Sequence, residues 1–75
     1  MAKEFNGYPS WNQWNVSLWI NNDEGLYNLC RDAVVQYGYE KAVRHIYSVI
    51  GGEKTPDGGV YNPTAIRRAI RGIAD

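Results

Sequence analysis

Residues 23–50 read DEGLYNLCRDAVVQYGYEKAVRHIYSVI and establish the helical class of the protein. Apolar residues recur there at intervals of three and four, the spacing that gathers side chains on one face of an α-helix. Gly38 separates two such stripes and is a favourable residue for ending a helix. The pattern predicts a helix that follows Asn22 and Asp23, either of which can be its N-cap, and that runs to about Tyr37. Another helix is predicted from Tyr39 to Ile50. The stripes are Leu26, Leu29, Cys30, Ala33, Val34 and Tyr37 in the first helix and Val43, Ile46 and Ile50 in the second.

A further helix is predicted before this pair, over residues 11–21, with Ser10 as its N-cap. Its apolar residues point in nearly all directions, which is typical of a helix that is buried on more than one side. We therefore expect this helix to be central, or to be shared with a second subunit. Trp11, Trp14, Leu18 and Asn21 share one face, whereas Val16, Trp19 and Ile20 lie on other sides.

The last predicted helix begins at Pro63, with Asn62 as its N-cap, and runs to about Ala74. Ile66, Ala69, Ile70 and Ile73 are expected to face inwards, and Arg67, Arg68 and Arg71 to face outwards. Residues 51–62 contain four glycines and a Pro56-Asp57-Gly58 turn signal, which predict a mobile surface loop that can form a hairpin. Residues 1–9 are predicted to be an irregular arm. The fold class is therefore all-α, a compact bundle of about four short helices in a single domain of residues 1–75.

The length and composition set further bounds on the protein. A chain of 75 residues has a small core, and its three tryptophans, six tyrosines and one phenylalanine are large side chains for it, so we also expect self-association as a homodimer or higher oligomer. Cys30 and His45 are the only residues of their types, which leaves no disulfide and argues against a metal or other cofactor. Eight basic and eight acidic residues argue against a DNA mimic and against a nucleic-acid coat protein. No apolar stretch approaches about 20 residues, and the N-terminus lacks a signal peptide, so we expect no membrane partner and a location in the cytoplasm.

The first predicted helix and its flanks hold the main candidate binding residues. Tryptophan rings with interleaved asparagine amides could recognise a planar base, because stacking supplies affinity and amides read polar edges. The alternative is structural: tryptophan at helical spacing packs into a core, and asparagine caps helices or faces solvent. Asparagine is a mediocre helix former, so its frequency here needs a reason such as polar contacts within an interface. The candidates are Trp11, Asn12, Trp14, Asn15, Trp19 and Asn22.

Arg67, Arg68 and Arg71 form a second candidate site on the last helix. They could pair with phosphates. The alternative is that they complement the negative C-terminal end of the helix dipole, although Arg67 and Arg68 lie in mid-helix. A catalytic triad of Cys30, Asp32 and His45 is conceivable, but Cys30 falls on the apolar stripe, and we expect no enzyme activity.

The segment from Asn6 to Tyr27, with the core WNVSLWINNDEGLY at residues 14–27, resembles a family of small proteins of unknown function. Members of that family are encoded mainly by tailed bacteriophages and related mobile elements. The resemblance implies a phage origin and expression in the cytoplasm of the infected bacterial host, and it carries over no site residues. It covers about a third of the chain, and we match the remainder to nothing.

These observations favour a non-enzymatic phage accessory protein that binds a host protein stoichiometrically and inhibits a host defence component. The first alternative is an oligomeric sponge for a nucleotide-derived signal, in which tryptophan and asparagine residues line a pocket and the three arginines hold phosphates. The second alternative is a small DNA-binding regulator, built on the two helices joined at Gly38, with Glu40, Lys41, Arg44 and His45 exposed on the later helix. Its few positive charges argue against a nucleic-acid partner.

Overall fold

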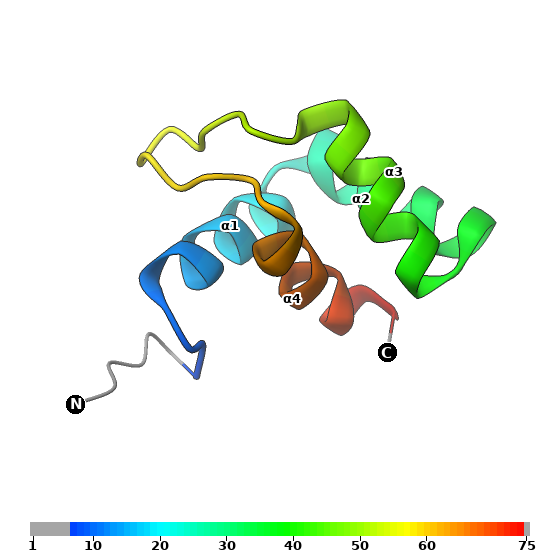
Figure 1. The fold of residues 1–75 in the computed structure, drawn as a ribbon, viewed down its shortest axis with the longest axis horizontal. Helices are drawn as coiled ribbons and strands as arrows, with labels where there is room; N and C mark the ends of the chain where they lie inside the picture. Colours follow the sequence, from blue (N-terminus) through cyan, green and yellow to red (C-terminus); the bar gives the residue numbers. More distant parts are fainter. Residues whose placement is uncertain (1–6, 75) are drawn as a thin grey trace.

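The computed structural model of the protein describes residues 7–74 and has four helices. They are α1 (Trp11–Asn22), α2 (Glu24–Tyr37), α3 (Tyr39–Ile50) and α4 (Pro63–Ala74), and no sheet occurs among the described residues (Figure 1). The all-α prediction is confirmed, and the helix bounds agree with the sequence analysis to within a residue or two. The predicted N-terminal arm lies outside the described residues over positions 1–6.

Side-chain hydrogen bonds confirm the predicted N-caps Ser10 and Asn62 and show that Asp23, and not Asn22, caps α2. Ser10 Oγ accepts from the backbone N–H of Gln13 at 3.2 Å. Asp23 Oδ1 accepts from the N–H of Leu26 at 3.0 Å, and Asn62 Oδ1 accepts from the N–H of Ala65 at 2.8 Å. These bonds satisfy backbone donors that the first turn of a helix leaves without an internal partner. The helix starts are thus determined locally by short polar side chains.

Gly38 is the joint between α2 and α3. Its φ of +83° lies in a region that residues with a Cβ rarely adopt, so glycine is required for this tight reversal. The N–H of Gly38 still donates to Val34 O at 2.9 Å, and its carbonyl already accepts from the N–H of Ala42 at 2.9 Å. One residue therefore closes the last turn of α2 and opens the first turn of α3.

The core consists of small and aliphatic side chains and is centred on α4, which packs against all three other helices. Figure 1 shows α4 between α1 and the α2–α3 pair. Of the two alternatives for residues 11–21, the central position is therefore wrong, and the sharing of this helix with a second subunit stays a prediction. The packing of tryptophan rings into the core is also wrong, because the buried core contains none of them. On α1 the inward positions hold Val16 and Ile20, so the indoles are directed elsewhere. The buried hydrophobic residues are Val16, Ile20, Cys30, Ala33, Ala42, Val43, Ile46, Tyr61, Ala65, Ile66, Ala69 and Ile70.

Residues 51–62 form a hairpin-like loop that returns over α1 (Figure 1). The N–H of Gly52 donates to Tyr61 O at 3.1 Å, and the N–H of Tyr61 donates to Glu53 O at 3.0 Å. Thr55 and Gly59 pair further out, through a 2.7 Å bond from Thr55 N to Gly59 O. The predicted hairpin is confirmed, and residues 52–54 and 56–58 lie on the surface as expected. Thr55, Gly59 and Tyr61 are buried, which the sequence analysis did not predict, and the mobility of the loop stays a prediction.

Candidate functional site

Asn12 holds the returning loop by its backbone. Its Nδ2 donates to Val60 O at 3.0 Å, and its Oδ1 accepts from Val60 N at 2.6 Å. A side-chain amide carries a donor and an acceptor side by side, so it can pair with both polar groups of one residue. Asn12 therefore substitutes for a neighbouring strand along this part of the loop.

Asn15 makes the second attachment and is almost completely buried. Its Oδ1 accepts from Thr55 Oγ1 at 2.5 Å. That hydroxyl in turn accepts from the backbone N–H of Gly59 at 2.9 Å. A Cβ atom on Gly59 would lie 2.7 Å from Asn15 Oδ1, so only glycine allows the loop to approach this closely. The result is a buried polar network in which each oxygen has a partner.

Asp57 receives two further hydrogen bonds from α1, at the exposed tip of the loop. Asn15 Nδ2 donates to Asp57 Oδ2 at 3.0 Å, and Trp19 Nε1 donates to the same oxygen at 2.9 Å. Both bonds favour the charged carboxylate, and together they lower the pKa of Asp57 below its ordinary value. Three candidate binding residues, Asn12, Asn15 and Trp19, are thus committed to holding the loop.

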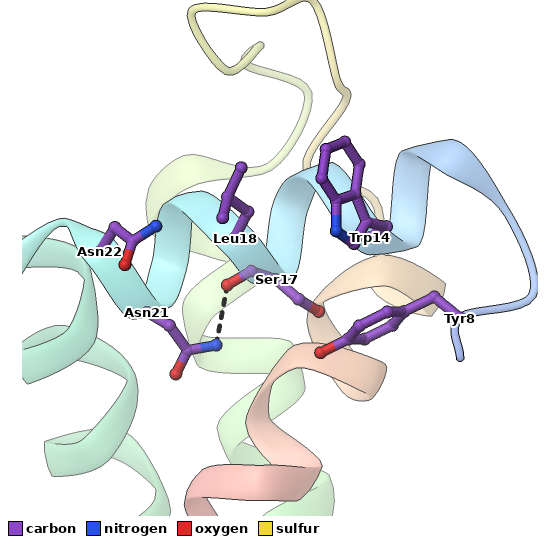
Figure 2. Close-up of a pocket in the computed structure, with 6 residues that line it drawn as sticks. All are labelled: Tyr8, Trp14, Ser17, Leu18, Asn21 and Asn22. Atoms are coloured by element: carbon purple, nitrogen blue, oxygen red, sulfur yellow. Dashed lines mark hydrogen bonds between the residues drawn. The ribbon is translucent and has the colours of Figure 1, made fainter. Parts of the chain in front are cut away.

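A pocket of about 190 Å³ lies on a different face of α1. Figure 2 shows Trp14 and Leu18 on one side, the ring of Tyr8 on the other, and Ser17 between them. Ser17 is 1% exposed, and its Oγ has no hydrogen-bond partner among the described residues. Asn21 Nδ2 donates to Ser17 O at 2.8 Å, along the helix. The pocket therefore combines aromatic walls with hydroxyl and amide groups, and its lining residues are Tyr8, Trp14, Ser17, Leu18, Asn21 and Asn22.

The three arginines of α4 have different surroundings. Arg67 forms an exposed ion pair with Glu40 at 3.5 Å. Arg68 lies over the ring of Tyr8, with its guanidinium carbon 4.5 Å from the ring centroid. Arg71 is exposed in the last turn, where a cation complements the helix dipole. Of the predicted phosphate-binding cluster, only Arg68 is in contact with a residue that lines the pocket.

A second surface feature is an apolar patch where α2 and α3 meet. The rings of Tyr37 and His45 lie 4.9 Å apart at their centroids, with an interplanar angle of 43°. Val49 follows His45 by one turn of α3 and lies on the same face. Tyr37 is 41% exposed and Val49 is 51% exposed. We call Tyr37, His45 and Val49 the α2–α3 patch.

Cys30 is buried in the core, and this desolvation raises the pKa of its thiol to about 12. The group therefore stays a thiol at neutral pH, whereas the thiolate is the nucleophile. His45, the base of the conceivable triad, lies against the ring of Tyr37 in a tilted arrangement instead. Within residues 7–74, no three His, Cys, Asp or Glu side chains gather as a metal site, and no helix is long and apolar enough to cross a membrane.

The comparison with known families covers the complete chain. Residues 1–75 match a family of unknown function (DUF7249). The chain belongs to this family. The match of the DUF7249 protein extends through the loop and α4, which the sequence analysis had matched to nothing. No curated protein and no solved structure matches the DUF7249 chain.

The structure divides the predicted site residues of the DUF7249 protein among several places. Trp14 and Asn22 line the pocket, and Arg68 adjoins it through Tyr8. Trp11 is exposed at the first position of α1. The remaining candidates either hold the loop (Asn12, Asn15 and Trp19) or lie outside the pocket on α4 (Arg67 and Arg71).

Sequence reasoning missed two groups of residues in the DUF7249 protein. The partners of the asparagines, Thr55, Asp57 and Val60, are 40 to 48 positions away along the chain, and no local pattern links them to α1. The pocket residues Tyr8 and Ser17 were also missed. The predicted common face of Trp14, Leu18 and Asn21 was a usable signal for Ser17, because Ser17 lies one turn from Trp14 and one turn from Asn21.

Proposed function

We propose that this DUF7249 protein is a non-enzymatic accessory protein that binds a partner protein stoichiometrically through the α2–α3 patch. The observation that carries the proposal is the exposure of Tyr37 and Val49 beside the ring of His45. Adjacent exposed rings and aliphatic side chains keep apolar surface in contact with water unless a partner covers them. Aromatic side chains are also the residue types that interface centres favour.

The rim of the patch indicates the chemistry of the partner. Lys41 precedes His45 by one helical turn and is exposed on the same side of α3. Ser48 lies between His45 and Val49 in the sequence, and its hydroxyl donates to His45 O at 2.6 Å. An apolar centre with a cation and a hydroxyl at its edge suits a partner surface that offers an apolar side chain flanked by a carboxylate. The absence of net charge in the chain leaves recognition to such local contacts.

The resemblance of residues 6–27 to proteins of tailed bacteriophages supports a phage origin and a bacterial host as the setting. We infer on that basis that the partner is a host protein in the bacterial cytoplasm and that its inhibition, including inhibition of a defence component, is the role. Self-association of the DUF7249 chain would use the same kind of surface. A homodimer formed through the α2–α3 patch would therefore compete with binding of the host protein.

Two valine-to-lysine substitutions provide a matched test. Val49 belongs to the patch, whereas Val35 is 80% exposed on α2 and is not one of its residues. The partner is first identified by affinity purification from the bacterial host, and its dissociation constant is then measured for purified wild type, Val49→Lys and Val35→Lys. We expect Val49→Lys to weaken binding at least about 10-fold, as for a central interface residue, and Val35→Lys to change it little.

Several outcomes would contradict the proposal. Equal affinities of wild type, Val49→Lys and Val35→Lys for the partner would show that the patch is not part of the interface. Turnover of nucleotide, peptide or ester substrates by the purified protein would show that the protein is an enzyme. Native mass spectrometry of the same samples reports subunit number, and a dimer that Val49→Lys dissociates would identify the patch as a contact between copies.

The second candidate function is an oligomeric sponge for a nucleotide-derived signal. One observation favours it: the pocket on α1 is lined by Trp14, Asn21 and Asn22, and Arg68 stacks on the wall formed by Tyr8. Native mass spectrometry after gentle purification from bacterial cells tests this candidate directly. An added mass of nucleotide size supports it, and bare subunits from cells that produce the signal contradict it.

A further inference from the structure

The pocket on α1 is built around a buried hydroxyl. Ser17 Oγ has no hydrogen-bond partner among residues 7–74, although the residue is 1% exposed. Figure 2 shows this oxygen directed to the side on which Tyr8 lies. A buried polar group without a partner is unfavourable, and a ligand that supplies the missing hydrogen bond would be favoured at this position.

The walls of the pocket define the shape of such a ligand. The ring of Tyr8 and the indole of Trp14 both line the pocket, and in Figure 2 Trp14 lies above Ser17 and Tyr8 lies below it. Rings of this kind bind planar heterocycles by stacking, with little dependence on which base is present. The volume, about 190 Å³, is below the roughly 300–1,000 Å³ of sites for drug-sized molecules. The pocket therefore accommodates a single ring system.

The polar groups of the pocket match the edge of a nucleobase. The side-chain amide of Asn22 makes no hydrogen bond with a described residue, and the Asn21 amide uses only one N–H, toward Ser17 O. Amides donate and accept at adjacent atoms, as do the edges of the bases. Arg68 adjoins the pocket: its guanidinium carbon lies 4.5 Å from the centroid of the Tyr8 ring, and the guanidinium can pair with a phosphate.

We propose that this pocket binds a mononucleotide. The base lies between Tyr8 and Trp14, its polar edge bonds to Ser17 Oγ and the Asn22 amide, and the phosphate pairs with Arg68. The inference rests on the second candidate function, and it is independent of the α2–α3 patch. Beyond that candidate function, the inference names the residues that recognise the ligand. It also states that each pocket holds a single base.

The test is a titration of the full chain with AMP, GMP, CMP and UMP. Binding is measured by calorimetry and by the NMR signals of the three tryptophan indoles. We expect saturable binding of at least one nucleotide, with a shift of the Trp14 indole and little change at Trp11 and Trp19. Ser17→Ala and Asn22→Ala each remove one hydrogen bond and should weaken binding about 3–10-fold. Arg68→Gln should weaken binding of the nucleotide more than binding of the nucleoside.

Matched controls separate the pocket from general effects. Asn28 and Arg44 are exposed on α2 and α3, so Asn28→Ala and Arg44→Gln should leave the affinity unchanged. Asn22 is exposed at the end of α1, so its substitution tests the pocket even if Ser17→Ala disturbs the fold. The proposal is overturned if no nucleotide saturates the protein, if ribose 5-phosphate or inorganic phosphate binds equally well, or if the controls weaken binding as much as the pocket variants. If a nucleotide is retained on purification and the pocket variants retain it equally well, the sponge function stands but this pocket is not its binding site.

Discussion

Replacing Asn12 by alanine removes both hydrogen bonds between α1 and the backbone of Val60. The lost contacts are Nδ2 to Val60 O at 3.0 Å and Val60 N to Oδ1 at 2.6 Å. The substitution changes no core side chain, because Asn12 lies beside the loop and is only half-buried. Its effect on stability therefore reports the attachment of the loop to α1.

The expected magnitude follows from two opposing contributions. Each hydrogen bond stabilises a folded protein by about 0.5–1.5 kcal/mol, so two bonds contribute about 1–3 kcal/mol. Alanine has a higher helix propensity than asparagine, which returns up to about 0.7 kcal/mol. The net loss is about 1–2 kcal/mol of the free energy of unfolding, which for a domain of this size lowers the melting temperature by about 5–15 °C.

Thermal unfolding followed by circular dichroism measures this loss, with Asn28→Ala as the control. Asn28 is exposed on α2, and its replacement should be neutral or slightly stabilising. Hydrogen exchange adds a local measurement, since the Val60 N–H should lose protection in Asn12→Ala before the core does. If both variants melt alike and the Val60 N–H stays protected, the argument that Asn12 anchors the loop is refuted.

Three further outcomes can be measured on the same protein. Gly59→Ala should lower the free energy of unfolding in denaturant by about 1–3 kcal/mol, because the new Cβ would lie 2.7 Å from the buried Asn15 Oδ1. Gly72→Ala is the control and should raise the free energy of unfolding, because Gly72 lies on open helix surface. Because the pKa of Asp57 is lower in the folded than in the unfolded protein, its carboxylate stabilises the fold fully above about pH 4. This stabilisation is lost as the pH falls through the folded-state pKa. The melting temperature of Asp57→Asn should therefore lack that part of the acid dependence. Cys30, with a pKa of about 12, should resist iodoacetamide in the folded state and react in denaturant, as mass spectrometry would show.

The helices were predictable because their signals are local. Ser10, Asp23 and Asn62 mark the starts by capping, and Gly38 marks the reversal between α2 and α3. The inward faces of α3 and α4 were also predictable, since their apolar residues fall on single stripes. In each case the information lies within one or two helical turns, which is the range that periodicity and capping cover.

The packing of α1 was not predictable by the same means. Its apolar residues surround the helix, so periodicity gives no direction for the core. The buried face includes the polar residues Asn15 and Ser17, which no hydrophobic pattern assigns to the interior. Asn15 is buried because Thr55 and Gly59 lie over it, and this contact spans 40 positions between Asn15 and Thr55. A tertiary contact of that range has no signature in either segment alone.

The tryptophan and asparagine segment divides by helix face between residues that hold the loop and residues that line the pocket. Asn12, Asn15 and Trp19 follow one another by three and four positions and bond to the loop. Trp14, Leu18 and Asn21 follow the same spacing, displaced around the helix, and line the pocket. Val16 and Ile20 form a third row, in the core. A helix with three occupied faces needs large or polar residues at nearly every position, which accounts for the unusual composition of the segment. Because the rows are separate, substitutions at Asn12 should change stability without changing the pocket, and substitutions at Asn22 should do the reverse.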